Sequence, residues 1–181
     1  MKTVDESKPM GFLQLAEKRY SVRRFYDKQV EQEKIEAILR AGQVAPTACN
    51  LQPQKVLVIQ SDDSLAKLRK CTGSHFNAPL AILTCYDKDL CWKRSYDGKS
   101  SGDIDASIVT THMMLEAADL GIGSTWVMHF IPEAVREEFR LPENYEPVSI
   151  LVMGYPAEDS KPAPAHTSIK PLSETVSYDE F

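Results

Sequence analysis

Three side chains that can bind phosphate lie at alternating positions near the start of the sequence: Arg19, Ser21 and Arg23. An extended backbone would place all three on one side, because side chains alternate along a strand. Each guanidinium group stays charged at any working pH and can donate two parallel hydrogen bonds to phosphate oxygens, and the Ser21 hydroxyl adds a neutral donor. The spacing favours a phosphate site, although a basic run over residues 18–28 is also typical of a solvated surface.

A second polar segment follows at residues 45–53. Pro46 interrupts the helical pattern before it, and Thr47, Asn50 and Gln52 then supply hydrogen-bond donors and acceptors. This inventory suits a sugar alcohol chain or the edge of a heterocycle. An ordinary polar turn has the same composition, so it is the combination of the two segments that indicates a site for a phosphorylated cofactor with polar edges.

The composition is that of a soluble enzyme with one domain. A chain of 181 residues is long enough to bury about 70% of the surface that its unfolded form exposes. The net charge of −5, from 21 basic and 26 acidic residues, does not favour nucleic acid or an anionic membrane as a partner. Residues 1–6 lack the apolar run of a secretory signal and no segment approaches the ~20 apolar residues of a membrane span, so we expect a cytoplasmic location.

The cysteine and histidine residues do not have the sequence spacing of metal ligands. The four cysteines contain no C-x-x-C pair and the four histidines are scattered, so we expect reduced thiols and no metal. Gly121 and Gly123 lack the third glycine of a dinucleotide fingerprint and follow a helical pattern instead of opening one. Phosphate-loop, serine-hydrolase and zinc-protease motifs are also missing from the sequence.

Hydrophobic periodicity predicts alternating helices and strands around a central sheet. The expected helices lie near 12–16, 31–43, 64–70 with a Ser64 cap, 103–120 with Gly121 as its stop, and 132–139. The expected strands lie near 55–59, 80–85 and 148–153. Residues 87–102, which include Trp92 and Tyr96, are either a mobile lid over an acceptor or a plain surface loop.

The C-terminal segment, residues 155–181, carries four prolines and no helical or strand stripe. A tail of this length needs a surface to lie on, unless it is a disordered terminus.

The order of these motifs resembles the nitroreductase family of FMN-dependent oxidoreductases. R-x-S-x-R-x-F and A-P-T-A-x-N-x-Q-P carry the likeness, which continues through 105–114, 120–126, 154–156 and 170–172. The resemblance implies an α+β fold with a central mixed or antiparallel sheet flanked by helices. It also implies an FMN-binding core over 1–154 and an extended arm over 155–181, exchanged across a homodimer with FMN at the subunit interface.

The resemblance assigns roles to matching positions. Arg19 and Ser21 match residues that hold the FMN phosphate, Tyr20 contributes at the same turn, and Arg23 matches a residue that reaches the ribityl chain and the pyrimidine edge. A backbone N–H at Val127 or Met128 would face the flavin N5. The remaining matches are a loop that comes from the partner subunit and a basic phosphate contact in the arm: Pro46, Thr47, Ala48 and Asn50, and Lys170.

Two positions depart from the family pattern. Ile169 stands where relatives commonly carry an arginine, so one phosphate charge is missing. Met128 stands where relatives tend to carry glycine, and its side chain would crowd the flavin face or narrow the substrate pocket.

The activity implied is ping-pong hydride transfer from NADH or NADPH through FMN to a small acceptor such as a nitroaromatic or a quinone. The cofactor carries the chemistry, so no side-chain acid or base is nominated, and His112 and His129 are not read as catalytic. Two alternatives stay open. One is another reduction on the same flavin fold, such as dehalogenation or reduction of an activated alkene, and the other is a non-catalytic protein that stores or senses FMN.

Overall fold

A four-stranded antiparallel sheet forms the centre of the protein, and its strand order is β1-β2-β4-β3. The computed structural model describes residues 11–181, so the prediction for residues 1–6 and the first ten residues of the predicted core lie outside the described range. The strands are β1 (Gln54–Ile59), β2 (Leu80–Asp87), β3 (Gly123–Val127) and β4 (Tyr145–Gly154). The helices are α1 (Phe12–Lys18), α2 (Gln32–Gln43), α3 (Asp62–Cys71), α4 (Gly102–Asp119), α5 (Pro132–Phe139) and α6 (Leu172–Thr175). Three short 3₁₀ turns complete the list, η1 (Ala48–Asn50), η2 (Gly73–His75) and η3 (Pro164–Thr167).

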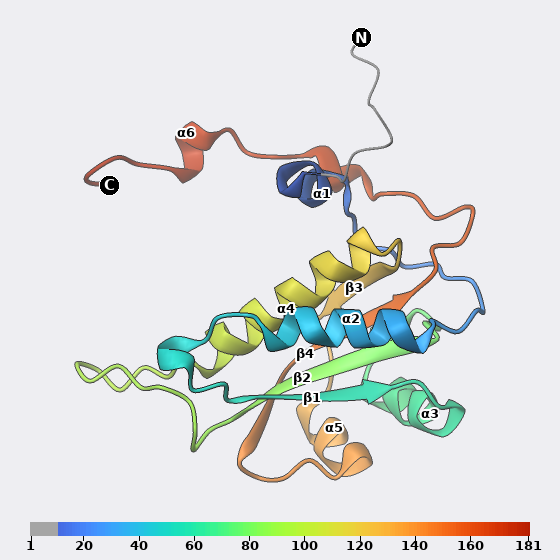
Figure 1. Cartoon of the computed structure of the whole chain (residues 1–181), viewed down its shortest axis with the longest axis horizontal. Coiled ribbons are helices and arrows are strands. Elements are labelled where there is room, and N and C mark those ends of the chain that lie inside the picture. The colour runs from blue at the N-terminus through green and yellow to red at the C-terminus, as the bar shows by residue number, and fades with distance from the viewer. Residues whose placement is uncertain (1–10) are drawn as a thin grey trace.

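Helices cover both faces of the sheet. In Figure 1, α2 and α4 lie on one face and α3 and α5 lie on the other. The two central strands, β2 and β4, are therefore buried on both faces, which explains their nearly continuous apolar sequences. A hydrophobic core lies on each face of the sheet, and successive residues of β2 point into one core or the other. Leu80 and Ile82 pack with α2 and α4, whereas Ala81 and Leu83 pack with α3 and α5. The predicted central sheet flanked by helices is confirmed.

Helix α4 is the longest element, and it ends as the sequence predicts. Gly121 takes the left-handed conformation (φ +75°), which glycine adopts without strain. The Ile122 N–H then donates to the Ala117 carbonyl at 2.7 Å and the Gly121 N–H donates to the Ala118 carbonyl at 3.1 Å. This pair of bonds is the Schellman ending of a helix, and it turns the chain directly into β3.

The start of α3 differs from the prediction. Ser61, not Ser64, is the N-cap, because its hydroxyl accepts the Ser64 N–H at 3.3 Å and Asp62 and Asp63 fill the first turn. The helix consequently begins at Asp62, and Ser64 lies within its first turn. Acidic residues in a first turn are favourable because the helix dipole is positive there.

Residues beyond Ser160 extend away from the body of the protein. In Figure 1 this segment passes α1 and extends away from the helices and the sheet, with only η3 and α6 as regular structure. Apart from the half-buried His166, every residue from 161 to 181 is exposed. Among residues 11–181, no helix is long and apolar enough to cross a membrane.

Candidate functional site

The segment that carries Arg19, Ser21 and Arg23 is extended and lies against the start of β3. Helix α1 ends at Lys18, and Arg19 already has extended backbone angles (φ −64°, ψ 141°). Ser21 forms a parallel bridge with Ser124, and the Val22 N–H donates to the Ser124 carbonyl at 3.0 Å. The backbone is therefore extended at Arg19 and is paired with β3 at Ser21.

A close approach of two backbones makes this arrangement possible. Val22 is only 2% exposed and packs on Gly123, where an added Cβ would lie 2.6 Å from a Val22 methyl group. Thr125, which follows Ser124 in β3, donates its hydroxyl to the Val22 carbonyl. With Val22 turned inward, Ser21 and Arg23 point to the opposite side, and Arg23 Nη1 donates to the Ser21 carbonyl at 3.2 Å.

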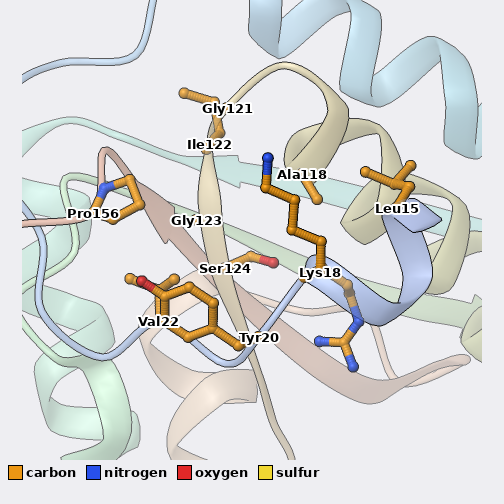
Figure 2. Close-up of a pocket in the computed structure, with 11 residues that line it drawn as sticks. Leu15, Lys18, Tyr20, Val22, Ala118, Gly121, Ile122, Gly123, Ser124 and Pro156 are labelled. Carbon is orange, nitrogen blue, oxygen red and sulfur yellow. The ribbon is translucent and has the colours of Figure 1, made fainter. Parts of the chain in front are cut away.

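A pocket of about 230 Å³ opens beside this segment, between the end of α1 and the end of α4. In Figure 2, the Lys18 side chain lies beside Ala118, and the Tyr20 ring lies beside Val22. The full lining is Leu15, Lys18, Arg19, Tyr20, Val22, Ala118, Gly121, Ile122, Gly123, Ser124 and Pro156. The structure therefore adds Lys18, which the sequence analysis left in the basic run, to the basic groups at this place.

The arginines of the segment divide by partner. Arg24 forms an ion pair with Asp159 at 2.7 Å. By contrast, neither Arg19 nor Arg23 lies within 4.0 Å of a carboxylate in the part of the chain that the structure describes. Of the predicted phosphate-binding residues, Arg19 lines the pocket together with Lys18, whereas Ser21 and Arg23 are not part of its lining. The charges of Arg19 and Lys18 at the pocket, in a chain of net charge −5, form a local positive site that suits an anion.

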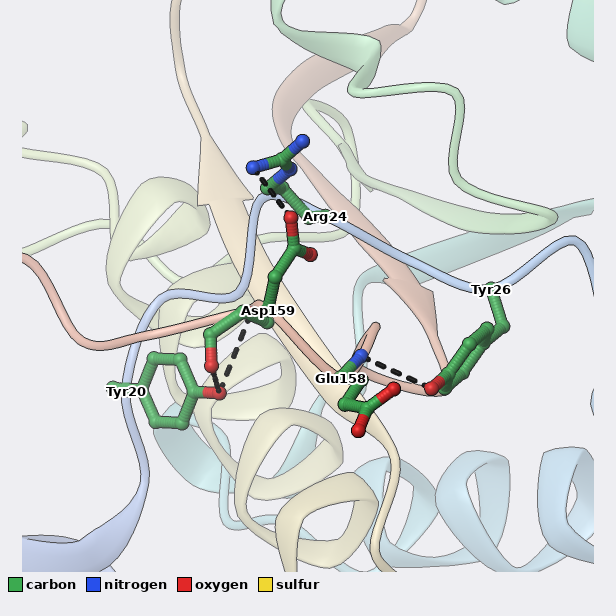
Figure 3. Close-up of polar contacts among 6 residues, drawn as sticks. Tyr20, Arg24, Tyr26, Glu158 and Asp159 are labelled. Carbon is green, nitrogen blue, oxygen red and sulfur yellow. Dashed lines mark hydrogen bonds and ion pairs between the residues drawn. The ribbon is translucent and has the colours of Figure 1, made fainter.

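The same segment also contacts residues 158–160, which we call the root of the C-terminal arm. Figure 3 shows Tyr20, Arg24 and Tyr26 in contact with residues 158–160. The Tyr20 hydroxyl donates to the Ser160 carbonyl at 3.3 Å, and the Glu158 N–H donates to the Tyr26 hydroxyl at 3.1 Å. Lys170 lies farther along the exposed arm and does not line the pocket, so one chain alone does not bring it to Arg19.

The predicted second half of the site, the loop after Pro46, has an unusual backbone. Cys49, Asn50 and Gln52 all have left-handed conformations, with φ of 52°, 54° and 50°. Such residues cost on the order of 1–3 kcal/mol each and persist only where the surroundings hold them, although asparagine tolerates the conformation better than most. Thr47 supports the loop from within, because its hydroxyl accepts the Gln52 N–H at 3.0 Å.

The two halves lie at opposite ends of α4. The Ala48 N–H donates to the Asp105 carboxylate in the first turn of the helix, whereas Ala118 in its last turn lines the pocket beside Arg19. The separation of thirteen positions between 105 and 118 corresponds to roughly 20 Å at the rise of an α-helix. A single chain thus separates Arg19, Ser21 and Arg23 from Pro46, Thr47, Ala48 and Asn50.

Val127 and Met128 differ in their surroundings. Val127 is buried in the core beneath α3 and α5, whereas Met128 is 71% exposed. The loop after β3 is fixed by two hydrogen bonds to the end of α3: the Thr72 hydroxyl donates to the His129 carbonyl at 2.6 Å, and the Ile131 N–H donates to the Cys71 carbonyl at 2.9 Å. Met128 is therefore an exposed side chain on a well-held backbone.

Met128 borders a hollow of about 540 Å³ with an acidic and aromatic lining. Its polar and aromatic members are Tyr86, Asp103, Ser107, Phe130 and Glu146. Burial, and then the charges of Asp103 and Glu146, raise the pKa of Tyr86 above its ordinary value, so the phenol is protonated at neutral pH.

The polar stretch over 87–102 contains a hydrogen-bonded hairpin. Lys93 bridges Ser100, and Arg94 holds Asp97 through Nε at 2.8 Å and Nη2 at 2.5 Å. Tyr96 at the tip is 95% exposed. The structure thus gives the stretch a defined shape, and its role as a lid stays a prediction.

The histidine, cysteine and acidic side chains that the structure describes form no metal site. No group of three His, Cys, Asp or Glu residues within 11–181 is placed to hold a metal ion. All four cysteines are unpaired, and only Cys49 is exposed. Burial raises the pKa of Cys85 to about 12, so that thiol is not ionised at neutral pH.

Comparisons with known proteins point to one family. A family model described as "Nitroreductase family" matches residues 16–84 and 74–155. A solved nitroreductase family protein from Clostridium difficile is 49% identical with a TM-score of 0.90, over 95% of this chain and 100% of that one. An FMN-dependent nitroreductase from the same organism is 30% identical with a TM-score of 0.76, over 92% and 98% of the two chains. A protein of Archaeoglobus fulgidus with the provisional name NADH dehydrogenase/NAD(P)H nitroreductase is 36% identical over 148 residues, 78% of this chain and 83% of the relative.

Proposed function

The chain belongs to the nitroreductase family, and from this premise we propose that it carries hydride from NADH or NADPH, through FMN, to a small acceptor such as a nitroaromatic or a quinone. The family and the names of its relatives support the enzyme class, an oxidoreductase, and both cofactors. The ping-pong order and the class of acceptor are our own proposals.

The residues present fit the phosphate of FMN. The observation that carries the proposal is that Arg19 and Arg23 have no carboxylate partner within 11–181, although the neighbouring Arg24 does. Arg19 and Lys18, which line the pocket, would bind the phosphate as charge-assisted donors, and Ser21, two residues after Arg19, would add a neutral donor. Bound FMN supplies the hydride chemistry, and the protein residues bind and orient it.

Arg23 has a second role in this proposal. Its guanidinium group lies beside the Ser21 carbonyl, farther along the segment from the pocket that Arg19 lines. A fixed positive charge near the heterocycle favours electron uptake, because it offsets the negative charge that reduction adds. The backbone at the end of β3, at Val127 and Met128, would face the reactive edge of the ring, with Met128 and the acidic hollow shaping the space for the acceptor.

We also propose that a second copy of the chain completes the site. Pro46, Thr47, Ala48 and Asn50 would come from that copy, because α4 keeps them roughly 20 Å from Arg19 within one chain. Two surfaces support a dimer: the exposed arm after residue 160, and an open hollow on α4 lined by Ile104, Ile108 and His112. On this arm Lys170 would reach a phosphate, and the exposed Ile169 would add no charge there.

The purified protein with FMN tests the enzymatic proposal. We expect the flavin absorbance near its visible maximum to bleach anaerobically on addition of NADH or NADPH and to return on addition of a nitroaromatic or a quinone. Bleaching without return by either acceptor would favour another reduction on the same fold. Bound FMN that neither nucleotide bleaches would exclude the oxidoreductase and leave storage or sensing.

A further inference from the structure

Asp105 is a buried carboxylate that joins α4 to the loop after Pro46. It lies in the first turn of α4 and is 2% exposed. Its Oδ1 accepts the Ala48 N–H at 2.9 Å, and its Oδ2 accepts the Ser101 hydroxyl at 2.7 Å. No basic side chain pairs with this carboxylate within 11–181, so its charge is supported by two hydrogen bonds and by the positive end of the helix dipole.

The loop depends on this contact. Its other hydrogen bonds join residues 47–52 to one another, as when the Asn50 N–H donates to the Thr47 carbonyl at 2.9 Å and the Leu51 N–H donates to the Ala48 carbonyl at 3.1 Å. Within the described residues, the Ala48–Asp105 bond is the one hydrogen bond that ties 47–52 to another element. A loop with three left-handed non-glycine residues would relax to ordinary backbone angles without such a tie.

We propose that Asp105 is a positioning residue for flavin binding, which it supports by holding the loop over 47–52 in its left-handed form; this inference rests on the proposed function. Asp105 fixes the peptide plane of Ala48, from which Cys49 and Asn50 continue in that form. The loop therefore presents Thr47 and Asn50 in one arrangement before any ligand arrives. A preorganised loop loses little conformational entropy on binding, so the contact acts on affinity without touching the ligand.

Three variants separate this role from ordinary stability. Asp105→Ala removes the carboxylate, whereas Asp105→Asn keeps the acceptor for the Ala48 N–H. Ala48→Pro removes the same bond from the loop side, and Thr47 before it already has the extended backbone that a following proline requires (φ −130°, ψ 159°). Thr110→Val is the matched control, because Thr110 is equally buried on α4 but bonds to Thr84 and Ser149 and does not contact the loop.

The measurements are amide hydrogen exchange of residues 49–52 in the FMN-free protein and the Kd for FMN from fluorescence titration. We expect Asp105→Ala and Ala48→Pro to speed the exchange and to raise the Kd about tenfold or more, while Asp105→Asn and Thr110→Val stay close to the wild type in both. If Asp105→Ala does not fold, Ala48→Pro and Asp105→Asn still decide the question.

Two results would overturn the inference. One is a change in amide hydrogen exchange or in FMN affinity that is as large in Thr110→Val as in the loop variants. That result would make Asp105 a purely structural residue. The other is faster amide exchange of residues 49–52 in Asp105→Ala together with a wild-type affinity for FMN. A wild-type protein that does not bind FMN would overturn the proposed function together with this inference, whereas wild-type binding that Asp105→Ala leaves intact would overturn the inference alone.

Discussion

Neighbouring arginines of one short segment have different electrostatic surroundings. Arg24 is neutralised by Asp159, so it contributes little net charge, and an exposed pair of this kind adds little stability. Arg19 and Arg23 keep their charge because no carboxylate within 11–181 meets them. The contacts of the segment with the arm produce this division: Arg24 pairs with Asp159 in the arm, whereas Arg19 and Arg23 form no ion pair there.

Replacing Arg19 with alanine should weaken FMN binding by about 1.5–3 kcal/mol, because a charge-assisted phosphate contact is lost. The dissociation constant would rise by about 10- to 150-fold, which fluorescence titration of the FMN-free protein can measure. Arg40→Ala is the control: it removes the same charge from the exposed face of α2, where Arg40 bonds only to Gln43. Equal retention of FMN by the two variants would refute the assignment of Arg19.

The side chains proposed to bind phosphate could be predicted from the sequence, but the residues that the fold brings to the site from elsewhere could not. Arg19, Ser21 and Arg23 are close in the chain, so their alternation was enough to predict a common face. Asp105 and Ala48 are 57 positions apart, and no local pattern indicates that they meet. Lys18 lacked a signal of its own, because a lysine at the end of a helix is commonly a favourable charge near the dipole and nothing more.

At the scale of elements, a cluster around Tyr155 joins α2 to the ends of α4 and β4. The Tyr155 hydroxyl donates to Glu31 at 2.5 Å, and Lys34 Nζ donates to the Tyr155 hydroxyl at 2.9 Å and to the Leu120 carbonyl at 3.1 Å. Lys28 lies over the Tyr155 ring, 4.0 Å from its centroid. The cluster holds together the elements against which the segment that carries Arg19, Ser21 and Arg23 lies. We call this segment the phosphate segment.

The hydrogen bond from Tyr155 lowers the pKa of Glu31 to about 2, and Lys28 adds to the effect. A carboxyl group whose pKa falls on folding stabilises the folded state above its unfolded pKa, and this contribution disappears as the pH falls from about 4.5 to about 2. Glu31→Gln should therefore be less stable than the wild type at pH 6, with a difference that narrows toward pH 3. Urea unfolding across this range measures the difference, and a gap that does not depend on pH would contradict the assignment.

Gly123 is required by the packing of β3 against the phosphate segment. A Cβ at this position would lie 2.6 Å from Val22 and 2.9 Å from Pro156, so Gly123→Ala should push the segment outward. We expect a loss of about 1–3 kcal/mol in the free energy of unfolding, together with weaker FMN binding. Gly73→Ala, where no atom lies within 4 Å of the added Cβ, is the control for the glycine substitution itself. Unchanged FMN binding in Gly123→Ala would show that the segment tolerates displacement.

Elements with strong periodicity were predicted well, whereas features set by distant partners were not. The buried strands β2 and β4 and the helix α4 with its Gly121 ending follow from local sequence. The predicted start of α3 differs from the observed one by two residues, because Ser61 and Ser64 are both good caps and only the fold selects between them. The bridge of Ser21 to Ser124 depends on a meeting of segments far apart in the chain, which periodicity does not report.

At the scale of the whole molecule, the two halves of the proposed site lie at opposite ends of α4, which leads to a test by complementation. Arg19→Ala and Asn50→Ala should each bind FMN poorly on their own. When the two variants are mixed and allowed to exchange subunits, half of the dimers become mixed, and each mixed dimer has one intact site, so about a quarter of the sites should recover. Flavin bound after gel filtration measures the recovery, and no recovery despite proven exchange would place both residues in the same chain's site.

The phosphate segment also covers the outer strand of the sheet. β3 is last in the strand order, and the start of its open side is occupied by the pairing of residues 21–22 with Ser124. An uncovered strand is a template on which another molecule can add, which leads to aggregation. The segment that we assign to the cofactor is therefore also a guard against self-association. A deletion there would remove the ligand and the guard together, so the expected product is insoluble protein and not a soluble, colourless one.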